Sequence, residues 1–96
     1  MRLEWSTWAQ ADRDAIFDYI EADNPRAAVA VDRRISDRVK VLQRLPRSGR
    51  AGRVEGTREL VISRTPYIAA YRIIGDAVRI LRVLHSSQQW PGDMPD

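Results

Sequence analysis

The sequence predicts an α+β fold of two layers, in which an N-terminal strand precedes an antiparallel helix hairpin and a C-terminal antiparallel three-strand meander. Two observations lead to this prediction. Apolar residues recur at helical spacing from residue 8 to residue 45 with one interruption, and short alternating segments bounded by turn residues follow from residue 58. The chain has 96 residues and no evident linker, so we expect one domain over 1–96, with 91–96 as a flexible tail.

The N-terminal part is predicted to be a short strand, Arg2–Trp5, followed by a helix. Ser6 or Thr7 can cap this helix, and Thr7 and Gln10 have the spacing of a capping box. One stripe of the helix is expected to be buried: Trp8, Ala11, Ala15, Ile16, Tyr19 and Ile20. The aromatic residues of this region are assigned to the core: Trp5, Trp8, Phe17 and Tyr19. The charged residues between them are expected to face water: Asp12, Arg13, Asp14 and Asp18.

A second helix is predicted after Asn24-Pro25, because asparagine caps helices well and proline is favoured at the first helical position. Its apolar stripe keeps helical spacing as far as Pro46, which is expected to end the helix: Ala28, Val31, Ile35, Val39, Leu42 and Leu45. The short connection predicts that the two helices form an antiparallel hairpin.

Residues 46–56 are rich in glycine and arginine and predict a surface loop, which either lies against phosphates or is a plain solvated connection. Three strands are expected after it, separated by turns at 64–66 and 75–76: Arg58–Ser63, Tyr67–Ile74 and Ala77–His85. Alternation places Arg82 and His85 on opposite faces of the last strand, unless that strand bulges or ends between them.

Basic residues are concentrated in the second half of the chain. Residues 1–32 contain three arginines against seven acidic residues, whereas residues 33–82 contain thirteen basic residues against four acidic ones. Such a field attracts nucleic acids or acidic protein segments. An arginine-rich composition without a binding role is the alternative, because every basic residue except Lys40 is arginine.

The single histidine and the lack of cysteine restrict the possible chemistry. They argue against the usual zinc sites and against a serine triad, so neither a metal nor a cofactor is expected. No segment has the length and hydropathy of a signal peptide or membrane span, and we expect a cytoplasmic protein with no membrane partner. The candidates that remain are arginines on the predicted sheet with nearby aromatic and polar residues, a set that could stabilise a charged phosphate and stack a base: Arg58, Arg64, Arg72, Arg79, Arg82, Tyr67, Tyr71, His85 and Gln88.

The order of the predicted elements, together with three C-terminal segments, resembles the RelE/ParE superfamily of bacterial type II toxin–antitoxin (plasmid-stabilisation) toxins. The segments are Gly-Thr-Arg-Glu-Leu-Val at 56–61, Pro-Tyr-Ile-Ala-Ala-Tyr-Arg at 66–72 and Arg-Val-Leu-His-Ser-Ser-Gln-Gln-Trp-Pro at 82–91. The resemblance implies growth arrest by the free toxin and neutralisation by a cognate antitoxin in a hetero-oligomeric complex. It also implies that operator DNA is bound only through the antitoxin.

The resemblance leaves the target open between two branches. RelE-like members cut mRNA on the ribosome, whereas ParE-like members inhibit DNA gyrase without known hydrolytic chemistry. For a nuclease, His85 matches a catalytic histidine of some members, with Arg58 and Arg82 as further catalytic candidates; a structural role for His85 is the alternative. Ile68 stands where nuclease members commonly have arginine, and the long hairpin is more typical of ParE, so the ParE branch is favoured. The residues expected to contact a target or nucleic acid are Arg50, Arg53, Arg64, Tyr67, Tyr71, Arg72, Arg79 and Gln88.

Overall fold

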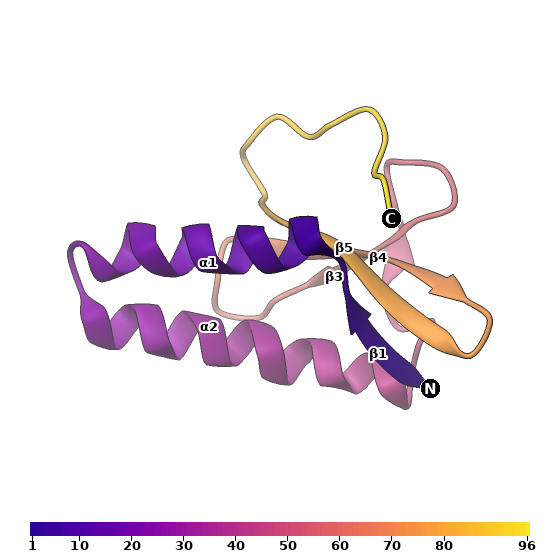
Figure 1. Ribbon diagram of the computed structural model, residues 1–96, viewed down its shortest axis with the longest axis horizontal. Helices are drawn as coiled ribbons and strands as arrows, with labels where there is room; N and C mark the ends of the chain where they lie inside the picture. The colour runs from indigo at the N-terminus through magenta and orange to yellow at the C-terminus, as the bar shows by residue number, and fades with distance from the viewer.

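The computed structural model describes residues 1–96 and confirms the α+β prediction: a helix hairpin lies against a sheet (Figure 1). The hairpin consists of α1 (Thr7–Glu21) and α2 (Pro25–Lys40), and the short 3₁₀ turn η1 (Val41–Gln43) follows it. The five strands are β1 (Arg2–Trp5), β2 (Arg50–Ala51), β3 (Arg58–Val61), β4 (Tyr67–Ile74) and β5 (Ala77–His85). Their order in the sheet is β1-β5-β4-β3-β2, and only the pair β1–β5 is parallel. The short strand β2, inside the predicted loop, was not expected from the sequence.

Ser6 joins the start of α1 to the edge of the sheet. Its side chain accepts a hydrogen bond from the backbone N–H of Ala9 at 3.0 Å and donates one to the carbonyl of Leu81 at 2.8 Å. Its own backbone N–H bonds to the carbonyl of Ile80 at 2.9 Å. Ser6 is therefore the N-cap, rather than Thr7, and it directs α1 along the part of β5 that β1 does not cover.

The predicted buried stripe of α1 is largely wrong. Trp8 and Tyr19 are 54% and 80% exposed, and the alanines of the same stripe, Ala11 and Ala15, are also exposed. Ala9 is the one fully buried residue of the helix, while Ile16 and Ile20 pack at the border of the main core. Two charged residues that were expected to face water, Asp12 and Arg13, are instead partly buried by ion pairs. The stripe is exposed because α1 lies beside the edge of β5 that β1 leaves uncovered. The face of the helix that is turned inward meets polar backbone groups of that edge, so polar side chains rather than apolar ones are partly buried there.

The second helix begins as predicted but ends earlier. Asn24 accepts a hydrogen bond from the N–H of Ala27 at 3.1 Å, and Pro25 occupies the first helical position. The helix ends at Lys40 rather than near Pro46, so the last residue of its predicted stripe, Leu45, lies outside it and is 55% exposed. The rest of the stripe is buried or half-buried under the hairpin, as expected: Ala28, Val31, Ile35, Val39 and Leu42. Neither helix is long and apolar enough to cross a membrane.

Apolar residues are buried on both faces of the sheet. The main core lies between the helices and the sheet and includes Ile35, Tyr71 and Ile80. A smaller cluster on the other face joins Leu81, Leu84 and Ala70 to Met94, which is 4% exposed, with Val54 and Trp90 packed against it. Residues 91–96, expected to be a flexible tail, have no regular secondary structure, but Met94 holds them against the sheet. Figure 1 shows this C-terminal segment arching away from β5 and returning toward the sheet.

Candidate functional site

Arg82, a catalytic candidate, is bound by a carboxylate of α1. Its Nε and Nη2 atoms donate to Asp12 at 2.8 and 3.0 Å, and Asp12 also accepts from the backbone N–H of Val83 at 2.9 Å. The hydrogen bond to Asp12 raises the pKa of Arg82 despite partial burial. Asp12 thus provides an acceptor for the backbone N–H of Val83, which no strand pairs, and it fixes α1 against the edge of β5. Arg82 therefore has a structural role in this contact.

His85 lies on the other face of β5 from Arg82. A bulge leaves Leu81 without a partner, so that Arg82 pairs with Ala70, whereas His85 pairs with Tyr67, a member of the main core. The two candidates therefore still point to opposite faces, as alternation predicted. The rings of His85 and Tyr67 meet edge to face at 5.5 Å, and burial raises the pKa of Tyr67, with a smaller contribution from Tyr19.

The hydrogen bonds of His85 determine which ring nitrogen carries the proton. Nδ1 lies 3.1 Å from the backbone N–H of Ser87, which can only donate, and 2.8 Å from the Ser87 hydroxyl. In the neutral ring Nδ1 is therefore the acceptor and Nε2 carries the proton. Gln88 accepts from the backbone N–H of His85 at 2.8 Å, and the indole of Trp90 donates to the His85 carbonyl at 3.2 Å. The predicted site residues His85 and Gln88 thus form one closed turn after β5.

Arg58 and Tyr71 hold the loop that precedes β2. Arg58 Nη1 donates to the carbonyls of Gly49 at 2.8 Å and Arg47 at 3.3 Å, and the Tyr71 hydroxyl donates to Pro46 at 2.7 Å while accepting from Gly49 N at 3.0 Å. A Cβ on Gly49 would lie 2.6 Å from the Tyr71 hydroxyl, so the close approach requires glycine. Burial is the main cause that raises the pKa of Tyr71. Tyr71 has no exposed surface with which to contact a target, contrary to expectation.

Glu59 collects the two loop arginines, Arg50 and Arg53. It is 3% exposed and accepts from Arg50 Nη2 at 3.0 Å, from Arg53 Nε at 3.1 Å and from the Arg53 backbone N–H at 2.8 Å. Arg53 also stacks on Trp90, with its guanidinium carbon 3.6 Å from the ring centroid. Burial alone would raise the pKa of Glu59, but the hydrogen bonds from Arg53 and Arg50 outweigh it and the pKa is lowered overall. The carboxylate therefore stays charged and holds both arginines near the C-terminal segment.

We expect the Glu59 network to stabilise the fold above pH 4.5 and to weaken in acid. Because the pKa of Glu59 is lower in the folded chain than its usual 4.5, its stabilisation is complete above that value and is lost as the pH falls through the folded-state pKa. Glu59→Gln should lower the free energy of unfolding at pH 7 by about 2 kcal/mol, since charge-assisted bonds to a buried group are lost. Urea denaturation from pH 7 to pH 3 measures both effects. Glu55→Gln, at an exposed position without a partner, is the control. A stability difference between Glu59→Gln and the parent chain that does not shrink in acid would contradict this role.

Arg72 and Arg79 face each other across β4 and β5, which places like charges side by side. Each has an acidic partner from a distant part of the chain: Arg72 lies 3.4 Å from Asp96, and Arg79 lies 3.3 Å from Glu4. The Nε atom of each arginine is buried without a hydrogen-bond partner. Their charges are thus partly offset, and Asp96 further fixes the C-terminal segment.

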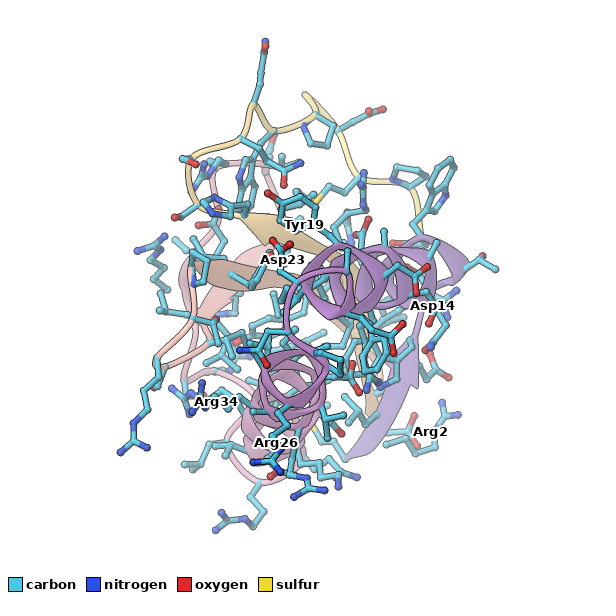
Figure 2. The ribbon with its side chains drawn as sticks, turned by 90° about the vertical axis from the view of Figure 1, so that its left-hand side faces the viewer. Arg2, Asp14, Tyr19, Asp23, Arg26 and Arg34 are labelled. Atoms are coloured by element: carbon cyan, nitrogen blue, oxygen red, sulfur yellow. The ribbon has the colours of Figure 1, made fainter.

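Arg64 differs from the other predicted site residues, because it makes no hydrogen bond or ion pair within the chain. It lies at the turn between β3 and β4 and lines an open pocket with two arginines of α2, Arg34 and Arg38. The α2 arginines were not singled out from the sequence. Figure 2, which looks toward the ends of the helices, shows Arg26 and Arg34 around α2, whereas Asp14, Tyr19 and Asp23 surround α1. In the hairpin, α1 therefore presents mainly acidic and aromatic side chains to the surface, and α2 presents mainly basic ones.

The predicted site residues do not converge on one centre. The catalytic candidates Arg58, Arg82 and His85 lie respectively under the loop before β2, against α1 and in the turn after β5. The signal that sequence reasoning missed was the acidic partner of most of these arginines, namely Arg50, Arg53, Arg72, Arg79 and Arg82. Asp12 and Glu59 each follow the local pattern of a surface residue, and only the fold brings them to Arg82 and to Arg50 and Arg53.

Comparison with known proteins agrees with this architecture. Residues 3–90 match the family described as "ParE toxin of type II toxin-antitoxin system, parDE". The protein Y4kP of Sinorhizobium fredii is 49% identical over 90 residues, covering 94% of this chain and 93% of the relative. Toxin RelE2 of Caulobacter vibrioides is 33% identical over 87 residues, covering 91% of this chain and 97% of the relative.

A solved structure is also similar. A chain of the chromosomal ParDE toxin–antitoxin system of P. aeruginosa superposes with a TM-score of 0.82 at 35% identity, covering 88% of this chain and 95% of that one. The family match spans both the helix hairpin and the whole sheet, as does the order of elements expected from the sequence. A type II toxin implies a cognate antitoxin as its partner. The chain belongs to the ParE toxin family of type II toxin–antitoxin systems.

Proposed function

We propose that this type II toxin arrests growth by acting on DNA gyrase, as a ParE-like toxin, rather than by cutting mRNA. The observation that carries the proposal is the hydrogen bond that His85 Nδ1 accepts from the backbone N–H of Ser87. An mRNA endonuclease needs a base to take the proton of a ribose 2′-hydroxyl and cations near the phosphate. In the neutral ring Nε2 already carries a proton, because Nδ1 accepts from the Ser87 backbone N–H. In this tautomer the outer nitrogen of His85 donates a hydrogen bond, which favours a structural role over that of a general base.

The arginine candidates support the same proposal. A phosphate held for cleavage would need guanidinium groups beside the base, yet Arg82 is paired with Asp12 on the opposite face of β5 and Arg58 donates to loop carbonyls. Inhibition of gyrase requires a contact surface rather than proton transfer, so it does not depend on a base at His85. The match to the ParE family supports action on gyrase. Because the chain is also similar to a toxin named RelE2, the experiment must be able to detect mRNA cleavage. A cytoplasmic location is part of the proposal, because gyrase acts on the bacterial chromosome.

The proposal predicts that His85→Gln remains toxic. Glutamine keeps the approximate size and hydrogen-bonding ability of the histidine, but it cannot exchange a proton near neutral pH. Cells induced to make either form should stop dividing with filamentation and DNA-damage signalling, while incorporation of labelled amino acids continues in the first minutes. Matched expression levels, checked by immunoblotting, are the control. A prompt collapse of incorporation that His85→Gln abolishes would overturn the gyrase proposal and establish an mRNA endonuclease.

A further inference from the structure

Three arginines, two from α2 and one from the β3–β4 turn, line one open pocket of about 310 Å³. Arg34 and Arg38 project from α2, and Arg64 comes from the turn between β3 and β4. The remaining lining residues are Asp37 and Ser63, and none of the five is hydrophobic. We name this group the arginine pocket.

The charges of the arginine pocket are not neutralised within the chain. The side chains of Arg34 and Arg64 make no hydrogen bond or ion pair, and that of Arg38 makes only one long bond, from Nε to the carbonyl of Val61 at 3.4 Å. The single acid, Asp37, lies 3.8 Å from Lys40. Most arginines of the sheet, by contrast, have a carboxylate partner. The pocket therefore concentrates positive charge that only a group from outside the chain can balance.

Arg64 is held in a backbone conformation that disfavours its residue type. Its φ is 64°, in the left-handed region, and it is the only non-glycine residue of the chain with a positive φ. The turn is fixed by Thr65, whose Oγ1 donates to the carbonyl of Ile62 at 2.9 Å and accepts from the N–H of Tyr67 at 3.1 Å. Glycine would adopt this conformation without strain, as Gly75 does in the next turn. Retained strain of this kind is typical of functional positions, and here it holds a guanidinium beside the pocket.

We propose that the arginine pocket binds backbone phosphates of duplex DNA, a contact that this chain makes itself. Guanidinium groups bind phosphate oxygens through paired hydrogen bonds, and three of them fit one or two neighbouring phosphates. A protein partner would be expected to insert an apolar anchor, for which the pocket has no hydrophobic lining. A single strand would be expected to stack its bases on aromatic rings, and the pocket has none. The proposal does not depend on whether gyrase is the target.

The adjoining surface supports a contact with an extended backbone. A second open pocket beside the first includes Arg33 and Lys40, on the same helix as Arg34 and Arg38. This second pocket also contains two acids, Asp32 and Asp37, which pair with Arg13 and Lys40, so Arg33 is its one cation without an ion pair. Phosphate contacts of this type position a protein on DNA without reading its sequence, so the binding should be independent of base order.

The test measures binding of the full chain to a fluorescently labelled duplex oligonucleotide by anisotropy at increasing salt. Each of Arg34→Gln, Arg38→Gln and Arg64→Gln should weaken binding about fivefold to tenfold at 0.1 M salt and make the salt slope shallower by about 0.9. Arg26→Gln is the matched control, because it removes the same charge from an exposed position of α2 outside the pocket. Single-stranded RNA of equal length should bind more weakly than the duplex. An equal loss in Arg26→Gln, or displacement of DNA by polyglutamate of equal charge, would overturn the proposal.

Arg64→Gly separates binding from folding at the same position. Glycine relieves the left-handed strain, so the variant should melt at or above the temperature of the parent chain while its DNA affinity falls as far as that of Arg64→Gln. Undiminished DNA binding by this variant would show that the Arg64 side chain is not part of the site. Weak binding combined with a clearly lowered melting temperature would also overturn the assignment, because Arg64 would then serve the fold.

Discussion

Expression of this chain without its antitoxin is expected to arrest bacterial growth and to lower colony formation by orders of magnitude. The chain belongs to a family of toxins that a partner neutralises, and its helix hairpin and five-stranded sheet enclose a hydrophobic core. Co-expression of the cognate antitoxin, which we expect the neighbouring gene to encode, should restore growth, because a bound antitoxin covers surface that the toxin needs. Plating of induced cells with and without the neighbouring gene measures the effect.

The growth experiment needs evidence of folding, because an unfolded toxin is also harmless. Solubility and circular dichroism of the purified chain provide it. The Asp12→Ala chain, which we expect to be strongly destabilised, should be less toxic at equal expression and serves as the internal control. Normal growth of cells that contain soluble, folded parent chain would contradict the assignment of toxic activity to this copy.

The elements that the sequence predicted well are those with local signals. The strands β4 (Tyr67–Ile74) and β5 (Ala77–His85) have the predicted bounds, because alternation is regular and Gly75, at a φ of 58°, allows a tight turn between them. Asn24 caps α2 as expected, since capping depends only on neighbouring amides. The strand before Arg64 ends two residues earlier than predicted, at Val61, because the left-handed turn begins there.

The errors in α1 arise from its surroundings rather than from its own pattern. The spacing of apolar residues predicted the helix correctly. It could not show which face of that helix would be covered by a neighbouring element. Here α1 runs beside the uncovered edge of β5, which offers a free N–H at Val83 and a carbonyl at Leu81. Polar side chains, Ser6 and Asp12, meet those groups, and the aromatic residues Trp8 and Tyr19 are left exposed.

The candidate site was harder to predict, because the role of an arginine depends on its partners. Five sheet arginines were similar in sequence, yet Arg82 has a partner 70 residues away in Asp12 while Arg64 has none. No local rule distinguishes them. The arginines of α2 were not singled out from the sequence, and only the position of the β3–β4 turn brings Arg64 to Arg34 and Arg38.

Loss of the Asp12 carboxylate is expected to lower the stability of the fold strongly. Its two oxygens accept from Arg82 at 2.8 and 3.0 Å and from Val83 N at 2.9 Å, and the side chains of Asp12 and Arg82 are only 16% and 22% exposed. Asp12→Ala leaves a partly buried guanidinium and a strand-edge N–H without partners. We expect a loss of about 3 kcal/mol or more in the free energy of unfolding, a large share of the total stability of a small domain.

The matched control for this substitution is Asp14→Ala, which removes the same charge from an exposed position of α1 without a partner and should change stability by less than about 0.5 kcal/mol. Arg82→Met combined with Asp12→Leu should recover much of the loss, because the uncompensated charge is then gone, although Val83 N–H still lacks its acceptor. Chemical denaturation at pH 7 of the parent chain, Asp12→Leu, Arg82→Met and the double variant gives the coupling between Asp12 and Arg82. Equal effects of Asp12→Ala and Asp14→Ala would mean that the α1–β5 edge contact contributes nothing to the fold, and that apolar packing alone holds α1 in place.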